Sequence, residues 1–151
     1  WDLADCIAIV EEENKPVGSS EGHKLASTSP LQNARVADTI RRLDICRSAI
    51  KNKDFQALAD IVELDSNIMH AVMMTSRPAL FYWEPSSLNI LKAVQAWRKA
   101  GLAAAATLDA GPNVHILCES KDAEGIHRRL KSMPGVKEII VCHPGGNTHL
   151  Q

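Results

Sequence analysis

The chain has 151 residues and a mass of 16.5 kDa, and 45% of its residues are hydrophobic, 4% aromatic and 23% charged. These values are typical of one soluble globular domain. With 17 Lys and Arg against 18 Asp and Glu, the formal net charge is -1. This balance excludes the broad basic surface that nonspecific binding to nucleic acid or to a membrane needs, so neither partner is expected. An anionic ligand must therefore be held by a local site.

The spacing of the cysteines indicates the redox compartment, and the first residues of the chain indicate a longer protein. Cys6, Cys46, Cys118 and Cys142 lie far apart without a Cys-x-x-Cys spacing, which predicts neither a zinc site nor a dense disulfide framework and fits a reducing cytoplasm. No apolar run approaches the roughly 18 residues of a membrane-spanning helix. The chain starts at Trp1 and soon enters an apolar run, so we expect a piece of a longer protein whose upstream part is absent.

The first half of the chain predicts one strand, one loop and two helices. Residues 5–11 are a short run rich in β-branched side chains, which suits a buried strand. The polar stretch 12–29 contains Pro and Gly residues and is expected to be a loop. Apolar residues then recur at helical spacing over 30–52 and over 54–77, with Asp54 as the N-cap of the second helix. We expect these two helices to pair antiparallel.

The second half predicts two more helices and three strands. A helix is expected from residue 84 to a stop at Gly101. The apolar runs 102–108 and 113–119 flank a short turn and predict an antiparallel hairpin. A helix over 122–133 and a strand over 136–142 complete the order β-ααα-ββ-α-β. Without its extra helices this order is β-α-β-β-α-β, so the predicted fold is α+β: a ferredoxin-like four-stranded antiparallel sheet with helices on one face.

The turn that starts at Asp109 is the first candidate for chemistry. The sequence Leu108-Asp109-Ala110-Gly111-Pro112-Asn113 places an acid at the end of an apolar strand and before a tight turn. A carboxylate there has a rigid support and a fixed position, as catalysis requires. The alternative is that Asp109 only begins the turn and bonds its own backbone, as Asp often does.

Two further segments could line a ligand site. Small residues, hydroxyls and free backbone N–H groups over 17–23 could cradle a phosphate, although Glu21 adds a negative charge and a plain flexible loop is the alternative. In the run 65–71, Asp65 and His70 are five residues apart and do not share a helix face as metal ligands four apart would. We therefore expect no metal site there, but this helix could line a pocket.

Taken in order, these segments resemble the C-terminal half of diphosphomevalonate decarboxylases, members of the galactokinase, homoserine kinase, mevalonate kinase and phosphomevalonate kinase superfamily. The resemblance runs from about Ile7 to Val141, nearly the whole chain. It rests on five motifs in register: Val17-Gly18-Ser19-Ser20-Glu21-Gly22-His23, Thr28-Ser29-Pro30, Asp65-Ser66-Asn67-Ile68-Met69-His70-Ala71, Arg77-Pro78 with Tyr82 beyond, and Asp109-Ala110-Gly111-Pro112-Asn113-Val114.

The resemblance implies a reaction and a set of site residues. The family phosphorylates the tertiary hydroxyl of a mevalonate phosphate with ATP and Mg²⁺, then releases phosphate and carbon dioxide to give an isopentenyl product of the isoprenoid pathway. Asp109 matches the catalytic aspartate, which can orient that hydroxyl and accept its proton. The residues that would bind the substrate phosphate are Ser19, Ser20, Gly22 and His23, and those that would line the pocket are Met69, His70, Ala110 and Gly111.

The resemblance also implies what this chain lacks. In the family, ATP and Mg²⁺ are held mainly by an N-terminal half with no counterpart here. We therefore expect residues 1–151 to be a single C-terminal substrate-binding and catalytic domain that is inactive alone. The intact protein is expected to be a cytoplasmic homodimer whose partner is a small molecule, mevalonate phosphate or diphosphate.

Three alternatives stay open. Where many family members have Thr or Arg this chain has Ser20, and Glu21 stands where an uncharged residue is common. One positive charge fewer and one negative charge more is a large change at short range, so the monophosphate is an alternative substrate. A kinase of the superfamily that does not decarboxylate is the second alternative. The third is a non-enzymatic ligand-binding or dimerisation module, because ferredoxin-like domains serve many functions.

Overall fold

The computed structural model describes residues 1–11 and 19–146, and of Ser19 and Glu21 it describes only the backbone. The residues Val17 and Gly18 of the expected phosphate segment lie outside this part. Along the chain the elements are β1 (Leu3–Ile9), α1 (Ser19–Ala26), α2 (Gln32–Ala37), α3 (Thr39–Asn52), α4 (Phe55–Met74), α5 (Pro85–Lys99), β2 (Ala104–Leu108), β3 (Val114–Glu119), a 3₁₀ turn η1 (Ser120–Asp122), α6 (Ala123–Lys131) and β4 (Glu138–Cys142).

The four strands form one antiparallel sheet in the order β2-β3-β1-β4. The predicted hairpin is confirmed, since Ala104 pairs with Cys118 and Leu108 with Val114 across β2 and β3. The first strand lies between the third and the last, as the β-α-β-β-α-β order requires. The predicted ferredoxin-like α+β fold is therefore confirmed.

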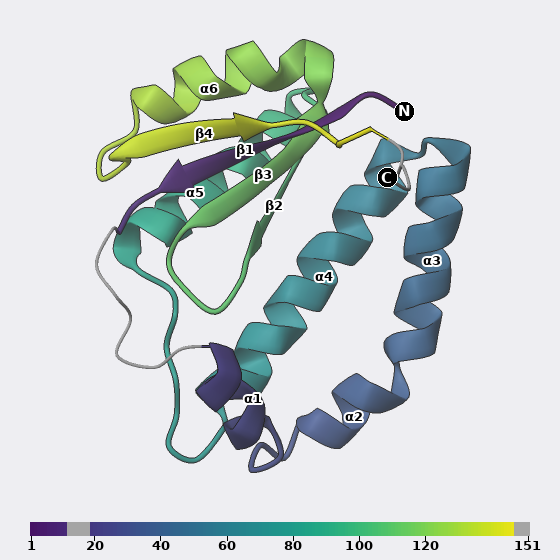
Figure 1. The fold of residues 1–151 in the computed structure, drawn as a ribbon, viewed down its shortest axis with the longest axis vertical. Coiled ribbons are helices and arrows are strands. Elements are labelled where there is room, and N and C mark those ends of the chain that lie inside the picture. Colours follow the sequence, from purple (N-terminus) through teal and green to yellow (C-terminus); the bar gives the residue numbers. More distant parts are fainter. Residues whose placement is uncertain (12–18, 147–151) are drawn as a thin grey trace, which may run out of the picture.

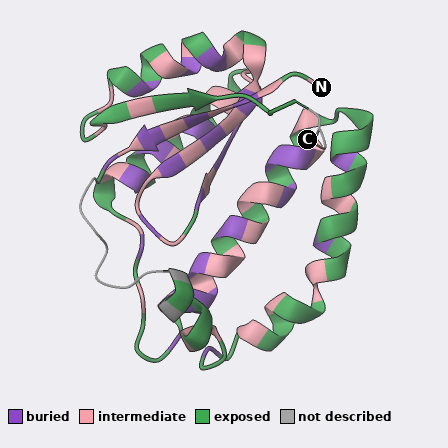
Figure 2. Ribbon diagram, viewed as in Figure 1, coloured by how far each residue is buried: buried purple, intermediate pink, exposed green. Residues whose placement is uncertain are grey.

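One face of the sheet and the inner sides of α5 and α6 form the main core (Figures 1 and 2). Successive strand residues point to opposite faces, so every second residue of β1 and β3 is buried. The strands contribute mainly small side chains, which let the helices approach closely, while the helices contribute large ones. The buried residues that carry this contact include Ala4, Cys6, Ala8, Ala104, Ala106, Ile116, Ile90, Val94, Ile126 and Leu130.

Helix α4 covers the outer edge of β2 (Figure 1). Its start agrees with the prediction, because the Asp54 side chain accepts a hydrogen bond from Ala57 N at 3.0 Å. An uncovered edge strand exposes backbone groups that invite pairing with other chains. Here side chains of α4 and α5 occupy those groups: Glu63 accepts from Ala106 N at 3.0 Å, Ser66 accepts from Leu108 N and donates to Leu108 O at 3.0 Å each, and Arg98 donates to Ala104 O at 2.9 Å.

The loop expected over residues 12–29 is wrong in its second half, where the chain forms α1. Glycine and serine have low helix propensity, which favoured a loop. Tertiary packing outweighs that propensity, since α1 lies against α4 and Gly22 is buried there. A Cβ at Gly22 would lie 2.8 Å from Tyr82 Oη. Only glycine therefore allows this close approach.

The single helix expected over residues 30–52 is also wrong, because α2 ends and α3 begins around Asp38. The Asp38 carboxylate accepts hydrogen bonds from Arg41 Nε at 2.6 Å and Arg42 Nη1 at 3.0 Å. The bond from Arg41 is the main reason that the pKa of Asp38 falls to about 2. With Asp38 at its N-cap, α3 begins at a carboxylate, which the positive end of a helix favours. At the end of α5 the expected glycine stop is present, with Gly101 at φ 95°.

Candidate functional site

The end of β2 is held from below by two side chains of α4. Ser66 Oγ exchanges two hydrogen bonds with the Leu108 backbone, and His70 Nε2 donates to Leu108 O at 3.2 Å. Both side chains are buried, Ser66 at 8% and His70 at 1% exposure. Because Leu108 immediately precedes Asp109, these bonds fix the backbone from which the Asp109 carboxylate projects.

The turn after β2 is anchored on both sides. Gly111 N donates to Asp109 O at 2.7 Å, and Ser87 Oγ of α5 donates to Pro112 O. Asn113 Oδ1 accepts from Val10 N and Glu11 N at 3.0 and 3.2 Å. These bonds attach the turn to α5 and to the chain that follows β1, so it is a rigid support.

The Asp109 side chain is exposed and forms no hydrogen bond or ion pair with the residues that the structure describes. The alternative in which its carboxylate bonds its own backbone is therefore not what is observed. A rigid backbone with an unpaired carboxylate leaves both oxygens available to a ligand hydroxyl.

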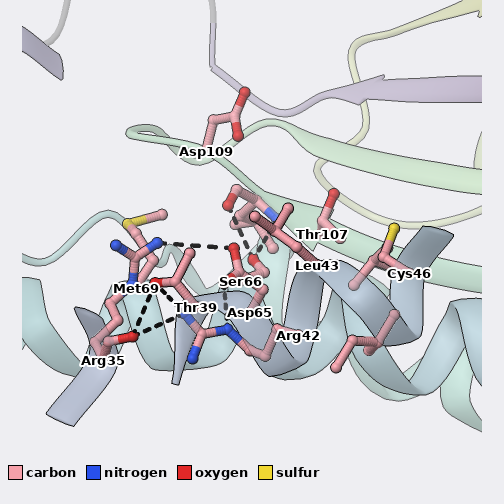
Figure 3. A pocket seen from close by; sticks show the side chains of 13 residues that line it. Arg35, Thr39, Arg42, Leu43, Cys46, Asp65, Ser66, Met69, Thr107 and Asp109 are labelled. Carbon is pink, nitrogen blue, oxygen red and sulfur yellow. Dashed lines mark hydrogen bonds and ion pairs between the residues drawn. The ribbon is translucent and has the colours of Figure 1, made fainter. Parts of the chain in front are cut away.

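Two cavities meet at Asp109. The first, of about 500 Å³, lies between α3, α4 and β2, and Figure 3 shows the side chains that line it. The second, of about 520 Å³, lies between α1, α2, α4 and the turn after β2. Three residues line both: Arg35, Met69 and Asp109. Asp109 is thus placed where ligands in either cavity can reach it.

The structure brings most of the predicted site residues to the second cavity. Its walls include Gly22, His23, Met69, Asp109 and Ala110. The predicted pocket residues His70 and Gly111 are buried beneath the site and line neither cavity, because His70 is directed to the Leu108 carbonyl. Ser20 is exposed on α1 outside the described cavity wall, and of Ser19 only the backbone, at the start of α1, is described.

Charged side chains gather on the helical wall of the first cavity. Arg42 is only 4% exposed, and its Nε donates to Asp65 Oδ1 at 2.8 Å while Nη1 donates to Asp38. Arg35 Nη2 lies 3.7 Å from Asp65 Oδ2. In Figure 3 this network lies on one side of the cavity and Asp109 stands apart from it. Among the described residues, this separation leaves Asp109 without a positively charged partner.

Sequence reasoning missed three polar residues of the second cavity: Gln32, Arg35 and Tyr82. Three of their polar atoms are buried and have no hydrogen-bond partner among the described residues: Gln32 Oε1, Arg35 Nε and Tyr82 Oη. Burial raises the pKa of Tyr82, so its hydroxyl stays protonated and can donate. The available signal was the spacing of Gln32 and Arg35, which are three residues apart on a helix face. Tyr82 was noted only as part of a family motif.

The described part of the chain has neither a cluster of metal-binding side chains nor a membrane-spanning helix. Residues 1–11 and 19–146 contain no group of three or more His, Cys, Asp or Glu side chains that could hold a metal ion. In the same part of the chain, no helix combines the length and apolar character that crossing a membrane requires. The described residues therefore do not form a Mg²⁺ site by themselves.

Because of the buried His70, the free energy of unfolding should depend on pH. Burial lowers its pKa, so folded His70 stays neutral below pH values of about 6.5, where an unfolded histidine takes up a proton. The unfolded state then binds more protons than the folded state. We expect the free energy of unfolding to fall between pH 7 and pH 5, and to fall less in His70→Gln, which keeps a donor for the Leu108 carbonyl. Urea unfolding at several pH values measures both.

The control for this prediction is His115. Its Nδ1 donates to Asp5 Oδ2 at 2.8 Å, and this bond raises its pKa. Its stabilising contribution is complete below about pH 6.5 and is lost as the pH rises above that value. His115→Gln should therefore leave the acid side of the profile unchanged. Equal slopes below pH 6.5 in the original chain and in His70→Gln would contradict the prediction.

Comparison with known proteins adds sequence and structural relatives. A family model described as "Mevalonate 5-diphosphate decarboxylase C-terminal domain" matches residues 6–146. The diphosphomevalonate decarboxylase of Candida albicans is 31% identical over 141 residues, which are 89% of this chain and 39% of that relative. The chain therefore spans about two fifths of the length of this curated relative, and less of others.

Solved structures agree in fold. The mevalonate pyrophosphate decarboxylase of Streptococcus pyogenes superposes with a TM-score of 0.89 at 28% identity, over 99% of this chain and 46% of that one. A structure described as MDDEF in complex with MVAPP, AMPPCP and magnesium superposes with a TM-score of 0.83 at 29% identity, over 93% of this chain and 43% of that one. With nearly its whole length matched in sequence and fold, this chain belongs to the family of mevalonate 5-diphosphate decarboxylase C-terminal domains.

Proposed function

We propose that residues 1–151 are the C-terminal substrate-binding and catalytic domain of a longer ATP-dependent diphosphomevalonate decarboxylase. The observation that carries the proposal is the Asp109 carboxylate, which is unpaired, rigidly supported and shared by two cavities. The reaction class, a decarboxylation, is taken from the relatives, which are named as decarboxylases. Because the chain spans about two fifths of the Candida relative, the remaining parts of the site would lie outside it.

In this proposal Asp109 acts on the tertiary hydroxyl of the substrate. The carboxylate accepts a hydrogen bond from that hydroxyl, orients its oxygen and takes up its proton as a phosphoryl group arrives. The C–O bond of the resulting phosphate ester then breaks and releases inorganic phosphate. The C–C bond to the substrate carboxylate breaks as well, which releases carbon dioxide, and its electron pair forms the carbon–carbon double bond. The support of Leu108 by Ser66 and His70 keeps the carboxylate in place during these steps.

Helix α1 would bind the phosphate of the substrate. It begins at Ser19, so the backbone N–H groups of Ser19 and Ser20 lie at a helix N-terminus, which favours anions. Gly22 and His23, one turn further on, line the cavity shared with Asp109. ATP and Mg²⁺ would be held mainly by a part of the intact protein outside this chain, as the resemblance to the family implies.

The mevalonate monophosphate is a second candidate substrate. The basic residues of α1, His23 and Lys24, lie in its last turn, and its first residues read Ser19-Ser20-Glu21 without a basic side chain. A site with fewer positive charges at the phosphate is better matched to a substrate with fewer negative charges. This observation favours mevalonate 5-phosphate over the diphosphate.

The test is ATP-dependent release of carbon dioxide by the intact protein, with mevalonate 5-phosphate and mevalonate 5-diphosphate offered separately. Release from either compound supports the decarboxylase, and the preferred compound identifies the phosphate number. Consumption of ATP without carbon dioxide would instead identify a kinase of the superfamily. No reaction with either compound would leave a ligand-binding or dimerisation module.

We also propose that the intact protein is a homodimer in the cytoplasm. Exposed apolar side chains along α2 and α3 support a protein interface, among them Val36 at 57%, Ile40 at 67% and Ile50 at 51% exposure. Sedimentation equilibrium of the intact protein measures the assembly, and a monomer at micromolar concentration would contradict it.

A further inference from the structure

The second cavity contains polar groups that the steps at Asp109 do not use. Tyr82 is only 8% exposed, and its Oη has no hydrogen-bond partner. The hydroxyl lies at the cavity wall close to α1, where a Cβ at Gly22 would be 2.8 Å away. Buried hydroxyls in folded proteins nearly always have a partner. A ligand atom in the cavity would supply one.

Helix α2 contributes two more groups to the same cavity. Arg35 Nε and Gln32 Oε1 are both buried without a partner, although Arg35 also approaches Asp65 through Nη2. The Gln32 amide can present either its oxygen or, rotated by 180°, its NH₂ group. With the Tyr82 hydroxyl, the cavity then has donors on helix α2 and on the segment before α5. Such a set fits a ligand rich in acceptor oxygens.

Two charged side chains line this cavity among the described residues: Asp109, which suits a hydroxyl, and Arg35, which favours an anionic group beside it. Arg35 is the one Lys or Arg among the described residues that line this cavity. Its neighbour Asp65 lies at 3.7 Å and is 49% exposed, so water screens that pair. A planar guanidinium binds phosphoryl oxygens well because its N–H groups match their geometry. Gly22 and His23 of the proposed phosphate segment line the same wall.

We propose that Gln32, Arg35 and Tyr82 form a phosphoryl-binding subsite, which holds the 5-phosphate of the substrate while Asp109 takes the tertiary hydroxyl. This inference rests on the proposed function for the identity of the substrate. It adds helix α2 and the segment around Tyr82 to the binding site.

The experiment is isothermal titration of the intact protein with three probes: inorganic pyrophosphate, mevalonate 5-phosphate and mevalonate. Arg35→Gln should weaken binding of both phosphate-bearing probes about 10-fold or more, since it removes a charge-assisted bond. Tyr82→Phe should weaken it about 3- to 10-fold, because it removes one neutral donor. Mevalonate, which has a carboxylate but no phosphate, should bind all variants equally.

Two controls separate binding from folding. Arg47→Gln removes a charge from exposed Arg47 on α3, which lines neither cavity, and should leave all affinities unchanged. Tyr82→Phe should not lower the melting temperature of the ligand-free protein, because its hydroxyl has no partner to lose. If Arg35→Gln unfolds, Arg35→Lys, which keeps the charge but lacks the Nε–H, replaces it.

The subsite would be overturned if the original protein did not bind pyrophosphate, or if both variants kept the original affinities. It would also be overturned if the variants lost as much affinity for mevalonate, because the substrate carboxylate would then be the group bound at Arg35 and Tyr82. Pyrophosphate titration does not depend on turnover. Variant-sensitive pyrophosphate binding without carbon dioxide release would therefore support the subsite and reject the decarboxylase. Carbon dioxide release together with phosphate binding that the variants do not change would support the decarboxylase and reject the subsite.

Discussion

Asp109→Asn in the intact protein is expected to lower the rate of ATP-dependent carbon dioxide release by about 10²- to 10⁴-fold, the usual contribution of a general base. Asparagine has nearly the same shape and can still accept a hydrogen bond from the hydroxyl, but its amide cannot take up a proton. Substrate affinity should therefore stay within a few-fold of the original. Steady-state rates and titration with mevalonate 5-phosphate and 5-diphosphate measure the two quantities.

A matched control for this substitution is Asp44→Asn. Asp44 is an exposed carboxylate on α3 that pairs with Arg47 at 3.3 Å and lines neither cavity. This variant removes the same charge from the domain and should keep the full rate. An Asp109→Asn enzyme with the full rate would remove Asp109 from the mechanism and favour a non-catalytic role for the domain.

The sheet and its hairpin could be predicted because short apolar runs beside turn residues are a local signal. Such a run depends only on neighbouring positions in the chain. The turn between β2 and β3 was marked by Gly111 and Pro112 for the same local reason. Asp109, at the end of a predicted strand, was therefore identified as a candidate before its surroundings were known.

Features that depend on distant parts of the chain could not be predicted. The glycine and serine content of α1 indicated a loop, whereas the helix is stabilised by contacts with α4 and with Tyr82. The joint at Asp38 brings one carboxylate to both Arg41 and Arg42, and the helical spacing of apolar residues in the sequence runs through it without a break. Gln32, Arg35 and Tyr82 become a group only when α2 and the segment before α5 line one cavity.

The side-chain bonds from α4 and α5 to the edge of β2 are another such feature. Removing them is expected to cause the largest change in the free energy of unfolding. Glu63 accepts two hydrogen bonds from Arg98, at 2.6 and 2.7 Å, and one from Ala106 N. Both charged side chains are mostly buried, at 14% and 17% exposure. The hydrogen bonds that Arg98 donates to Glu63 raise the pKa of Arg98, which stays charged. One carboxylate therefore joins α4, α5 and β2.

Glu63→Ala is expected to lower the free energy of unfolding by about 3–5 kcal/mol, since it leaves the mostly buried Arg98 charge with only the Ala104 carbonyl as an acceptor and leaves the Ala106 N–H with none. Urea unfolding measures the loss. Glu63→Gln retains an acceptor oxygen and should lose less, while Glu124→Ala, at an exposed position on α6, should change little. If Glu63→Ala matched Glu124→Ala, water would be replacing the carboxylate at the β2 edge, and the backbone before Asp109 would be held by Ser66, His70 and the core without help from Glu63.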